Sequence, residues 1–320
     1  MIYTAEAVSS HHPDKICDQI ADALLDYYLH IDPESRVALE VLGGHGQIVV
    51  MGEVTSKAKI NIKKAVNKYL ELHTHKKMKV ISKVVRQSVE ISKGVDKGGA
   101  GDQGIMIGYA CNENEDYIPQ ELYVARKLLK PFIVDAKSQV TIKNGKVTDI
   151  VLSVVGKKKK ALVNYVMKFL VVNEIKCVKM VNIFINSAGS WTVGCFDSDC
   201  GTVGRKIVAD AYGPRVPVGG GAFSGKGPSK VDRSGAYMAR WIALDLLKKR
   251  KAKEVIVKLA YAIGKEKPIM EVAIIDGKEE KIDYDCRPQS IIKKFNLKIP
   301  QYLRTAINGH FGFNYSWEKI

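Results

Sequence analysis

The chain has 320 residues, of which 46% are hydrophobic and 26% charged, and its formal net charge is +16. This length and apolar content exclude intrinsic disorder and fibrous classes and predict two or three cooperating units with sizeable cores. No stretch approaches the roughly 20 apolar residues of a membrane span, and the N-terminus lacks a signal-peptide pattern, so we expect a cytoplasmic protein. Six cysteines without a C-x-x-C pair predict reduced thiols.

The basic excess is mostly lysine, because only ten of the 50 basic residues are arginine. Surfaces that read nucleic-acid bases favour the bidentate fork of arginine, so the lysine excess favours a solvated surface over a nucleic-acid interface. The runs at 157–160 and 248–251 fit a turn and a helix end. It stays open whether some of these cations converge on a small polyanion.

The first third of the chain begins with a short extended stretch. An amphipathic helix is predicted over 15–29, where Ile16, Ile20, Leu24 and Tyr28 recur at helical spacing. A hairpin over 36–42 and 47–54 follows, and then come a helix over 59–72 and a strand over 79–85.

A glycine-rich break at 94–104 separates this part from the next. The pattern then predicts a strand over 105–110, a helix over 120–129, strands over 134–142 and 147–154, and a helix over 161–173. In the last third it predicts strands over 181–186 and 191–195, a glycine-rich run at 219–227, a helix over 232–249, and strands over 254–263 and 269–275. The fold class is therefore α+β, with three similar units over 1–95, 96–195 and 196–320.

The mouth of the first helix carries three kinds of functional group. His12, Asp14 and Lys15 supply a titratable ring, a carboxylate that suits a metal, and a cation, at a helix N-terminus where phosphate binds. A residue that only caps the helix is the alternative. For Asp18 and Asp22, which continue the spacing of Asp14, we expect a solvated helix face.

Two glutamates interrupt the apolar strands of the hairpin. Glu40 and Glu53 face either water or a cleft, where they would accept a cation or an ammonium group. The loop 98–104 places Asp102 among glycines, which is a weak signal. Asp135 and Lys137 alternate with Gln139 on one face of a predicted strand, and that face is either a site or the solvent side.

Two later loops suit phosphate. At 199–206 an acid and the pair Arg205–Lys206 lie on a glycine-bearing turn. Residues 220–226 match G-x-x-x-x-G-K, but Gly227 replaces the Ser or Thr of a P-loop and Pro228 prevents its helix. The run is instead a loop with Lys226 and Lys230, and it leads into a helix opened by Asp232. A mobile surface loop is the alternative.

These signals agree in kind. The cations that would neutralise a triphosphate are Lys137, Arg205, Lys206, Lys226 and Lys230. Asp14 and Asp232 would hold magnesium, and Glu53 and Asp102 would meet an amine.

Five ordered motifs resemble the methionine adenosyltransferase family. They are H-H-P-D-K at 11–15, G-A-G-D-Q-G at 99–104, D-A-K-S-Q-V-T at 135–141, D-C-G-T-V-G-R-K at 199–206 and G-G-G-A-F-S-G-K at 219–226. The resemblance implies three α+β domains related by a pseudo-threefold, which can interleave across the three segments, and a homodimer or homotetramer with active sites between subunits. It also implies that the methionine sulfur attacks C5′ of ATP and that the tripolyphosphate is hydrolysed to phosphate and diphosphate.

The family pattern assigns a role to each candidate residue. It implies catalytic roles for His12, Lys137, Arg205, Lys206 and Lys226. It adds ATP contacts at Asp135, Ser190, Trp191, Asp199 and Ala222. Methionine contacts would come from Glu53, Lys93, Asp102, Asp199 and Lys230. Two Mg²⁺ per site would involve Asp14 and Asp232, and K⁺ would lie at Glu40.

Some positions depart from the family pattern. His11 stands where the family has glycine, Lys93 replaces a glutamine at the start of the gating loop, Ser190–Trp191 replaces Arg-Phe, and Gly227 replaces an aspartate. The chain is also short between Tyr117 and Asp135, near 157–160 and after Trp317. These departures leave the choice of dimer or tetramer and the gating open, and the sequence alone does not decide whether K⁺ is required. An ATP phosphohydrolase or kinase is the main alternative, and a nucleic-acid binding protein ranks below it.

Overall fold

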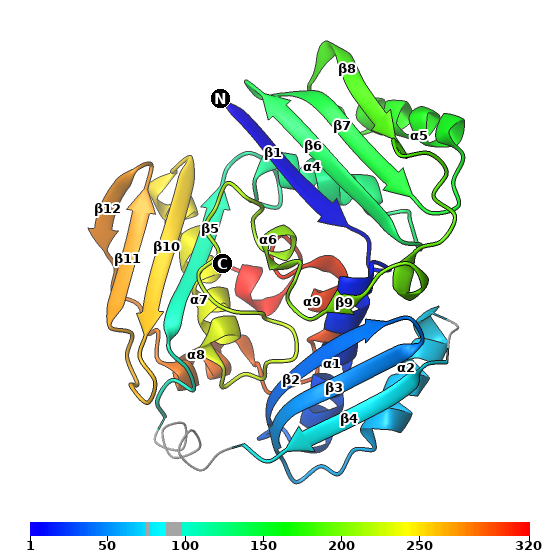
Figure 1. The fold of residues 1–320 in the computed structure, drawn as a ribbon. Helices are drawn as coiled ribbons and strands as arrows, with labels where there is room; N and C mark the ends of the chain where they lie inside the picture. The colour runs from blue at the N-terminus through cyan, green and yellow to red at the C-terminus, as the bar shows by residue number, and fades with distance from the viewer. Residues whose placement is uncertain (75–76, 88–97) are drawn as a thin grey trace.

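Three four-stranded sheets surround a helical centre in the computed structural model, which describes residues 1–74, 77–87 and 98–320. Figure 1 shows the sheets at the periphery, with α1 (Pro13–Ile31), α6 (Ile207–Asp210) and α9 (Leu303–Asn308) between them. We name each sheet after one of its inner strands.

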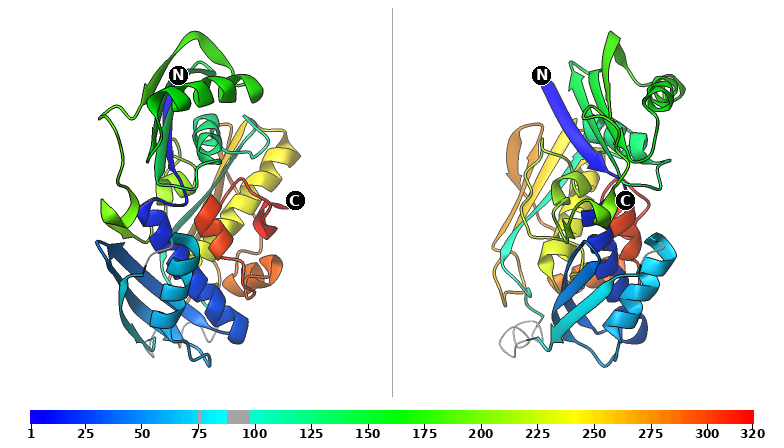
Figure 2. Two further views of the ribbon diagram at one scale, coloured as in Figure 1. Left: turned by 90° about the vertical axis from the view of Figure 1, so that its right-hand side faces the viewer. Right: turned by 45° about the vertical axis from the view of Figure 1, so that its right-hand side comes forward.

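The β6 sheet has the strand order β1-β6-β7-β8. Its strands are β1 (Ile2–Val8), β6 (Ala136–Lys143), β7 (Lys146–Val154) and β8 (Cys177–Ile185). The pairs β1–β6 and β6–β7 are antiparallel, whereas β7–β8 is parallel because α5 (Lys159–Val172) carries the chain back across the sheet. Figure 2 shows α5 beside this sheet, and α4 (Gln120–Leu129) packs against β1 and β6.

The β3 sheet repeats this arrangement in the order β9-β2-β3-β4. Its strands are β2 (Arg36–Gly44), β3 (Gln47–Thr55), β4 (Lys79–Val85) and the short β9 (Gly201–Thr202). The hairpin β2–β3 is antiparallel, and α2 (Ile62–Thr74) connects β3 to the parallel β4. Past β9, the edge of β2 is paired again where Ala38 bridges Lys226.

The β10 sheet is antiparallel throughout, in the order β12-β11-β10-β5. Its strands are β5 (Gly104–Cys111), β10 (Glu254–Tyr261), β11 (Met270–Ile275) and β12 (Lys278–Lys281). The long helix α7 (Val231–Arg250) packs on β5 and β10, and α8 (Pro288–Phe295) packs on α7. Each sheet thus takes one strand from another of the three predicted segments: β1, β9 and β5 all lie outside the segment that supplies the rest of their sheet.

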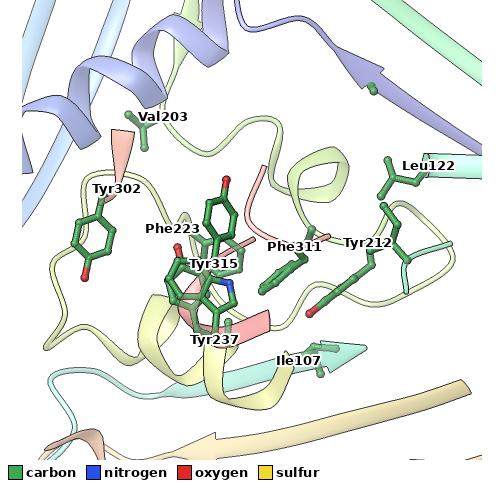
Figure 3. Close-up of a cluster of buried hydrophobic side chains, with 14 of the residues drawn as sticks. Ile107, Leu122, Val203, Tyr212, Phe223, Tyr237, Tyr302, Phe311 and Tyr315 are labelled. Carbon is green, nitrogen blue, oxygen red and sulfur yellow. The ribbon is translucent and has the colours of Figure 1, made fainter. Parts of the chain in front are cut away.

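An aromatic cluster joins the three sheets at the centre. Tyr237 of α7 stacks on Trp317 in the short helix η2 (Ser316–Glu318), with ring centroids 3.7 Å apart. Tyr212 stacks on Phe311 at 4.6 Å, and Phe223 meets Phe311 edge to face. Figure 3 shows these rings gathered from loops and helices that are distant in the sequence. The C-terminal segment is therefore part of the core.

Most predicted elements are present, with ends shifted by a few residues. The strand expected over 191–195 is wrong, because residues 191–194 have no regular structure and the short helix η1 (Cys195–Asp197) follows them. The sequence reading missed β12, α8 and α9. The solvated face expected for Asp18 and Asp22 is also wrong: their exposed fractions are 2% and 0%, because α1 is packed on nearly every side.

Within the described residues, no helix is both long enough and apolar enough to cross a membrane.

Candidate active site

His12 begins α1 and is almost completely buried. It is the N-cap, and its Nδ1 accepts a hydrogen bond from the backbone N–H of Asp14 at 3.2 Å. A neutral imidazole that accepts at Nδ1 carries its proton on Nε2. Burial, followed by the charges of Lys206 and Lys137, lowers the pKa of His12 to about 4. At neutral pH the ring is therefore an uncharged hydrogen-bond donor.

Asp14 joins the helix to the 199–206 loop. Its Oδ1 accepts from the backbone N–H of Thr202 at 2.9 Å, and its Oδ2 accepts from Lys206 Nζ at 2.5 Å. Arg205 lies 3.6 Å from Oδ1. Burial alone raises the pKa of Asp14, but the hydrogen bonds from Lys206 and Thr202 outweigh it and hold the pKa below its usual value. The carboxylate is therefore ionised and holds both cations beside His12.

Asp135 and Lys137 reach the same region from the start of β6. Lys137 is exposed, and its charge acts on His12. Asp135 is buried; its Oδ2 accepts from the Cys195 backbone N–H at 2.8 Å, whereas no hydrogen bond to Oδ1 is formed by any described residue. Burial raises the pKa of Asp135. An unused buried acceptor beside this cluster suits a ligand that brings its own donor, such as a sugar hydroxyl.

The 219–227 loop carries a second cation and a second carboxylate. Lys226 Nζ lies 3.2 Å from Asp232 Oδ2, and the other oxygen of Asp232 accepts from the Gly221 backbone N–H at 3.0 Å. Gly204 touches Ala222 so closely that a Cβ on Gly204 would lie 2.4 Å from the Cβ of Ala222. The two loops that suit phosphate are therefore in direct contact.

Glu40 and Glu53 share one face of the β3 sheet with Lys226. Ala38 pairs with Glu53 on one side and with Lys226 on the other, and directly paired residues of antiparallel strands point to the same face. Glu40 lies two residues from Ala38, so it points to that face too. Burial raises the pKa of Glu40, and the charge of Lys226 opposes this. The two glutamates thus flank the phosphate loops.

The remaining candidates form no hydrogen bond or ion pair with His12 among the described residues, or they lie outside those residues. Lys230 Nζ is 3.7 Å from Asp102 Oδ2. Between this pair or Glu53 and the cluster around His12, no hydrogen bond or ion pair is found in the part of the chain that the structure describes. Lys93 falls outside that part. Asp199 is close enough for its charge to raise the pKa of His12, so this predicted methionine contact lies near the ring. For the others the grouping stays a prediction.

Ser190 and Trp191 line a cavity of about 460 Å³ together with the lysine run at 157–159. The indole Nε1 of Trp191 donates to the Val193 carbonyl at 2.8 Å, which fixes the ring at the cavity wall. Asp199 is exposed at the start of its loop. The chain leads from this cavity to Asp135: four residues after Trp191, the backbone N–H of Cys195 donates to the Asp135 carboxylate.

The sequence prediction missed two residues that hold the loops, because acids at helical spacing indicated a solvated face. Asp18 accepts from the Gly204 backbone N–H, and Asp22 accepts from that of Gly225, both at 2.9 Å. Arg233, which is 1% exposed, forms a bidentate pair with Asp22 at 2.7 and 2.8 Å. Cys17, Ala21 and Leu25 on the same helix were the clue that this face is buried.

The carboxylates are suited to magnesium only in combination with a ligand. No group of three or more His, Cys, Asp and Glu side chains that could hold a metal occurs among residues 1–74, 77–87 and 98–320. Mg²⁺ usually binds one or two carboxylates, several waters and substrate phosphates. Asp14 and Asp232, each beside a lysine, fit that pattern.

The fold and these loops define a class of protein: an α+β enzyme of three sheets whose glycine loops bring together cations and carboxylates, as a polyphosphate ligand would require. The chain belongs to the S-adenosylmethionine synthetase family. Models of the N-terminal, central and C-terminal domains of that family match residues 1–95, 97–191 and 193–319.

The relatives cover the whole chain. It is 38% identical to the S-adenosylmethionine synthase of Mycoplasmopsis pulmonis, over 100% of this chain and 96% of the relative. It is also 38% identical to that of Parvibaculum lavamentivorans, over 99% of this chain and 95% of the relative. The solved structure of an unusual S-adenosylmethionine synthetase from Campylobacter jejuni superposes with a TM-score of 0.88 at 32% identity, covering 99% of this chain and 96% of that one. The first alignment spans 364 positions against a chain of 320 residues, so this chain is the shorter one.

Proposed function

We propose that the chain makes S-adenosylmethionine from ATP and L-methionine, and that it then hydrolyses the tripolyphosphate to phosphate and diphosphate. The observation that carries this proposal is the arrangement of His12, Asp14 and Lys206 beside Lys137, in a chain of this family. A buried neutral donor next to several cations suits a reaction in which negative charge grows on a leaving oxygen.

In this reaction the methionine sulfur forms a bond to C5′ of ATP while the bond from C5′ to the tripolyphosphate oxygen breaks. The Nε2–H of His12 donates a hydrogen bond to that oxygen. Lys137 binds the phosphate next to it. Arg205, Lys206 and Lys226 hold the rest of the chain of phosphates through both steps. Asp135 binds the ribose with its unused oxygen, and Ser190, Trp191, Asp199 and Ala222 complete the nucleotide site.

Metal ions would complete the charge balance. The family uses a divalent metal and potassium, and we propose two Mg²⁺ per site, with Asp14 and Asp232 as protein ligands. Magnesium would neutralise phosphate oxygens and hold them in place. Glu40, on the shared face with Lys226, would be the K⁺ ligand.

Methionine binding requires a second copy of the chain in this proposal. Glu53, Lys93, Asp102, Asp199 and Lys230 would contact methionine, yet Glu53 and Asp102 have no described contact with the cluster around His12. The face of the β3 sheet that carries Glu53 also exposes Leu42, Met51, Ile81 and Val85 by 40–52%. An apolar sheet face of this kind suits burial against a partner. We therefore propose a homodimer, or a tetramer of two dimers, with active sites across the interface.

The direct test is to incubate the purified protein with ATP, methionine, Mg²⁺ and K⁺ and to measure S-adenosylmethionine, orthophosphate and diphosphate. All three products are expected. Release of phosphate from ATP without methionine would favour a phosphohydrolase or kinase instead, and absence of all three over a range of K⁺ concentrations would overturn the proposal. Size measurement in solution distinguishes dimer from tetramer. The cytoplasmic location and the lack of a nucleic-acid partner stay predictions.

A further inference from the structure

The acid row of α1, which we define as Asp14, Asp18, Asp22 and Asp26, binds the backbone of three distant segments. Each carboxylate follows the last by one helical turn, and each accepts at least one backbone N–H. The segments held are the 199–206 loop at Thr202 and Gly204, the 219–227 loop at Gly225, and residues 301–303. One face of one helix therefore fixes both phosphate loops relative to each other.

Two of these bonds fall directly before a cation. Asp18 holds the N–H of Gly204, and Arg205 follows. Asp22 holds the N–H of Gly225, and Lys226 follows. A bond at this point fixes where each cation leaves the backbone, so only side-chain rotation remains free. This matters for a site that must align a phosphate chain, because a misplacement of about 1 Å can cost a factor of about 100 in rate.

Lys226 is held from both sides. Arg233 donates from one nitrogen to Asp22 at 2.7 Å and to the Lys226 carbonyl at 3.1 Å. On the other side, the backbone N–H of Lys226 donates to the Phe223 carbonyl at 3.2 Å. Gly225 has a φ of +80°, and a Cβ there would lie 2.0 Å from the Leu39 carbonyl oxygen. These contacts hold the loop backbone in this conformation, and Asp22 and Arg233 supply two of them.

Stability alone does not account for this pair. Burying two charges has a desolvation penalty that their attraction often only offsets, and apolar residues of similar volume are commonly as stable. A bidentate pair has a geometric consequence that an apolar pair lacks, because it directs specific donors and acceptors at a loop. Here those groups are directed at Gly225 and Lys226.

We propose that Asp18, Asp22 and Arg233 are positioning residues for the polyphosphate site. Asp18 sets the backbone that carries Arg205 and Lys206. Asp22 and Arg233 set the backbone that carries Lys226. None of the three touches the substrate. The inference rests on the proposed function, because it takes these cations to bind the tripolyphosphate chain.

The test is a set of double-mutant cycles in which the affinity for inorganic tripolyphosphate in the presence of Mg²⁺ is measured by calorimetry. The first cycle combines Lys226→Ala with the charge-neutral pair Asp22→Asn/Arg233→Gln, which leaves no unpaired buried charge. Each change is expected to weaken binding about tenfold. If the pair acts through Lys226, the variant with both changes should bind tripolyphosphate at most about twofold more weakly than whichever of the two separate variants binds it less tightly. Independent losses that multiply to about a hundredfold would overturn the role of the pair.

A second cycle uses the other loop and gives the matched comparison. Asp18→Asn should be coupled to Lys206→Ala and not to Lys226→Ala, whereas the pair variant should show the reverse. A general loosening of the fold would not produce this crossed pattern. Asp26→Asn is the control, because Asp26 lies on the same row but holds residues 301–303, and it should change the affinity by less than about twofold. Equal coupling in all combinations would contradict the inference.

The outcomes separate the inference from the proposed function. If the wild type makes S-adenosylmethionine but the losses in the variants multiply, the proposed function stands and the positioning roles are refuted. If the wild type binds tripolyphosphate and the variants show the crossed coupling, but no S-adenosylmethionine is made, the proposed function is refuted and the positioning roles stand. Wild type that does not bind tripolyphosphate overturns both. If the pair variant fails to fold, the Asp18 cycle decides, since Lys15 retains Asp210 as an ion-pair partner there.

Discussion

Asp14 and Asp22 lie on one helix, two turns apart, and both are almost completely buried, yet their surroundings differ. Asp22 has all its partners within the protein: both arginine nitrogens and one backbone N–H. Two partners of Asp14 reach solvent: Lys206 is partly exposed, and Arg205 beside it is half exposed. Burial and residue type therefore do not distinguish a ligand-binding carboxylate from a structural one. What distinguishes them is whether the partner cations are free to turn toward a ligand.

The largest effect should come from leaving Asp22 without its partner. Arg233→Ala buries an uncompensated carboxylate, and the free energy of unfolding should fall by about 3–5 kcal/mol in urea denaturation. The Asp22→Asn/Arg233→Gln variant should lose clearly less, since it leaves no charge unpaired. If the single and double variants are equally unstable, Asp22 is not the partner that matters.

At the N-cap of α1, before the acid row, His12→Asn should lower activity and leave stability unchanged. Asparagine is a good N-cap, so α1 should begin normally. The turnover number should fall about 100- to 1000-fold through loss of the donor to the leaving oxygen. His11→Ala is the matched control: it removes the neighbouring ring and should leave turnover within a few-fold. Similar losses in both variants would indicate a disturbed helix start instead.

Acid should destabilise the His12 end selectively. The pKa of His12 is about 4 in the folded protein against 6.5 ordinarily, so the unfolded chain binds a proton that the native state refuses. Above pH 6.5 the titration of His12 has no effect on the free energy of unfolding. As the pH falls from 6.5 towards 4 that free energy declines, by up to about 3 kcal/mol in total. Urea titrations across this window should show a flatter profile for His12→Asn. An unchanged profile would contradict the assignment.

The smallest effect should belong to Asp26, which holds structure remote from the site. Asp26→Asn keeps one acceptor for the backbone of 301–303, so unfolding should cost about 1–2 kcal/mol less than in the wild type. Turnover and the Michaelis constant for ATP should stay within about twofold. A strong loss of turnover would mean that the whole acid row, and not only its first three members, supports the site.

Local sequence patterns predicted the long helices well. The helix of α4 was predicted over its observed range, and α1 and α7 were predicted within a few residues. Failures occurred where tertiary contacts decide. Residues 191–194 have a β-rich composition but no partner strand, and β12 has charged residues typical of a loop. Its pairing with β11 supplies what the composition does not.

The site could be predicted by kind of residue but not by arrangement. Glycine loops with cations indicated phosphate, and the register now shows Glu40, Glu53 and Lys226 on one face, a question that the sequence left open. Asp18 and Asp22 were misread because charge at helical spacing normally marks a solvated face. Their partners in the loops lie 186 and 203 residues away, so a local pattern could indicate a buried face but not what it binds.

Because each sheet includes one strand from another segment of the chain, its contacts form late during synthesis. β1 is made first, but its partner β6 ends at Lys143, and the loops that bind α1 come after residue 200. A nascent chain on the ribosome therefore holds the first helix with its carboxylates unsatisfied until most of the protein has been translated. Contacts of such long sequence separation slow folding. Release of the C-terminal third is therefore expected to assemble the proposed catalytic centre, so premature termination should yield inactive chains even where the early motifs are complete.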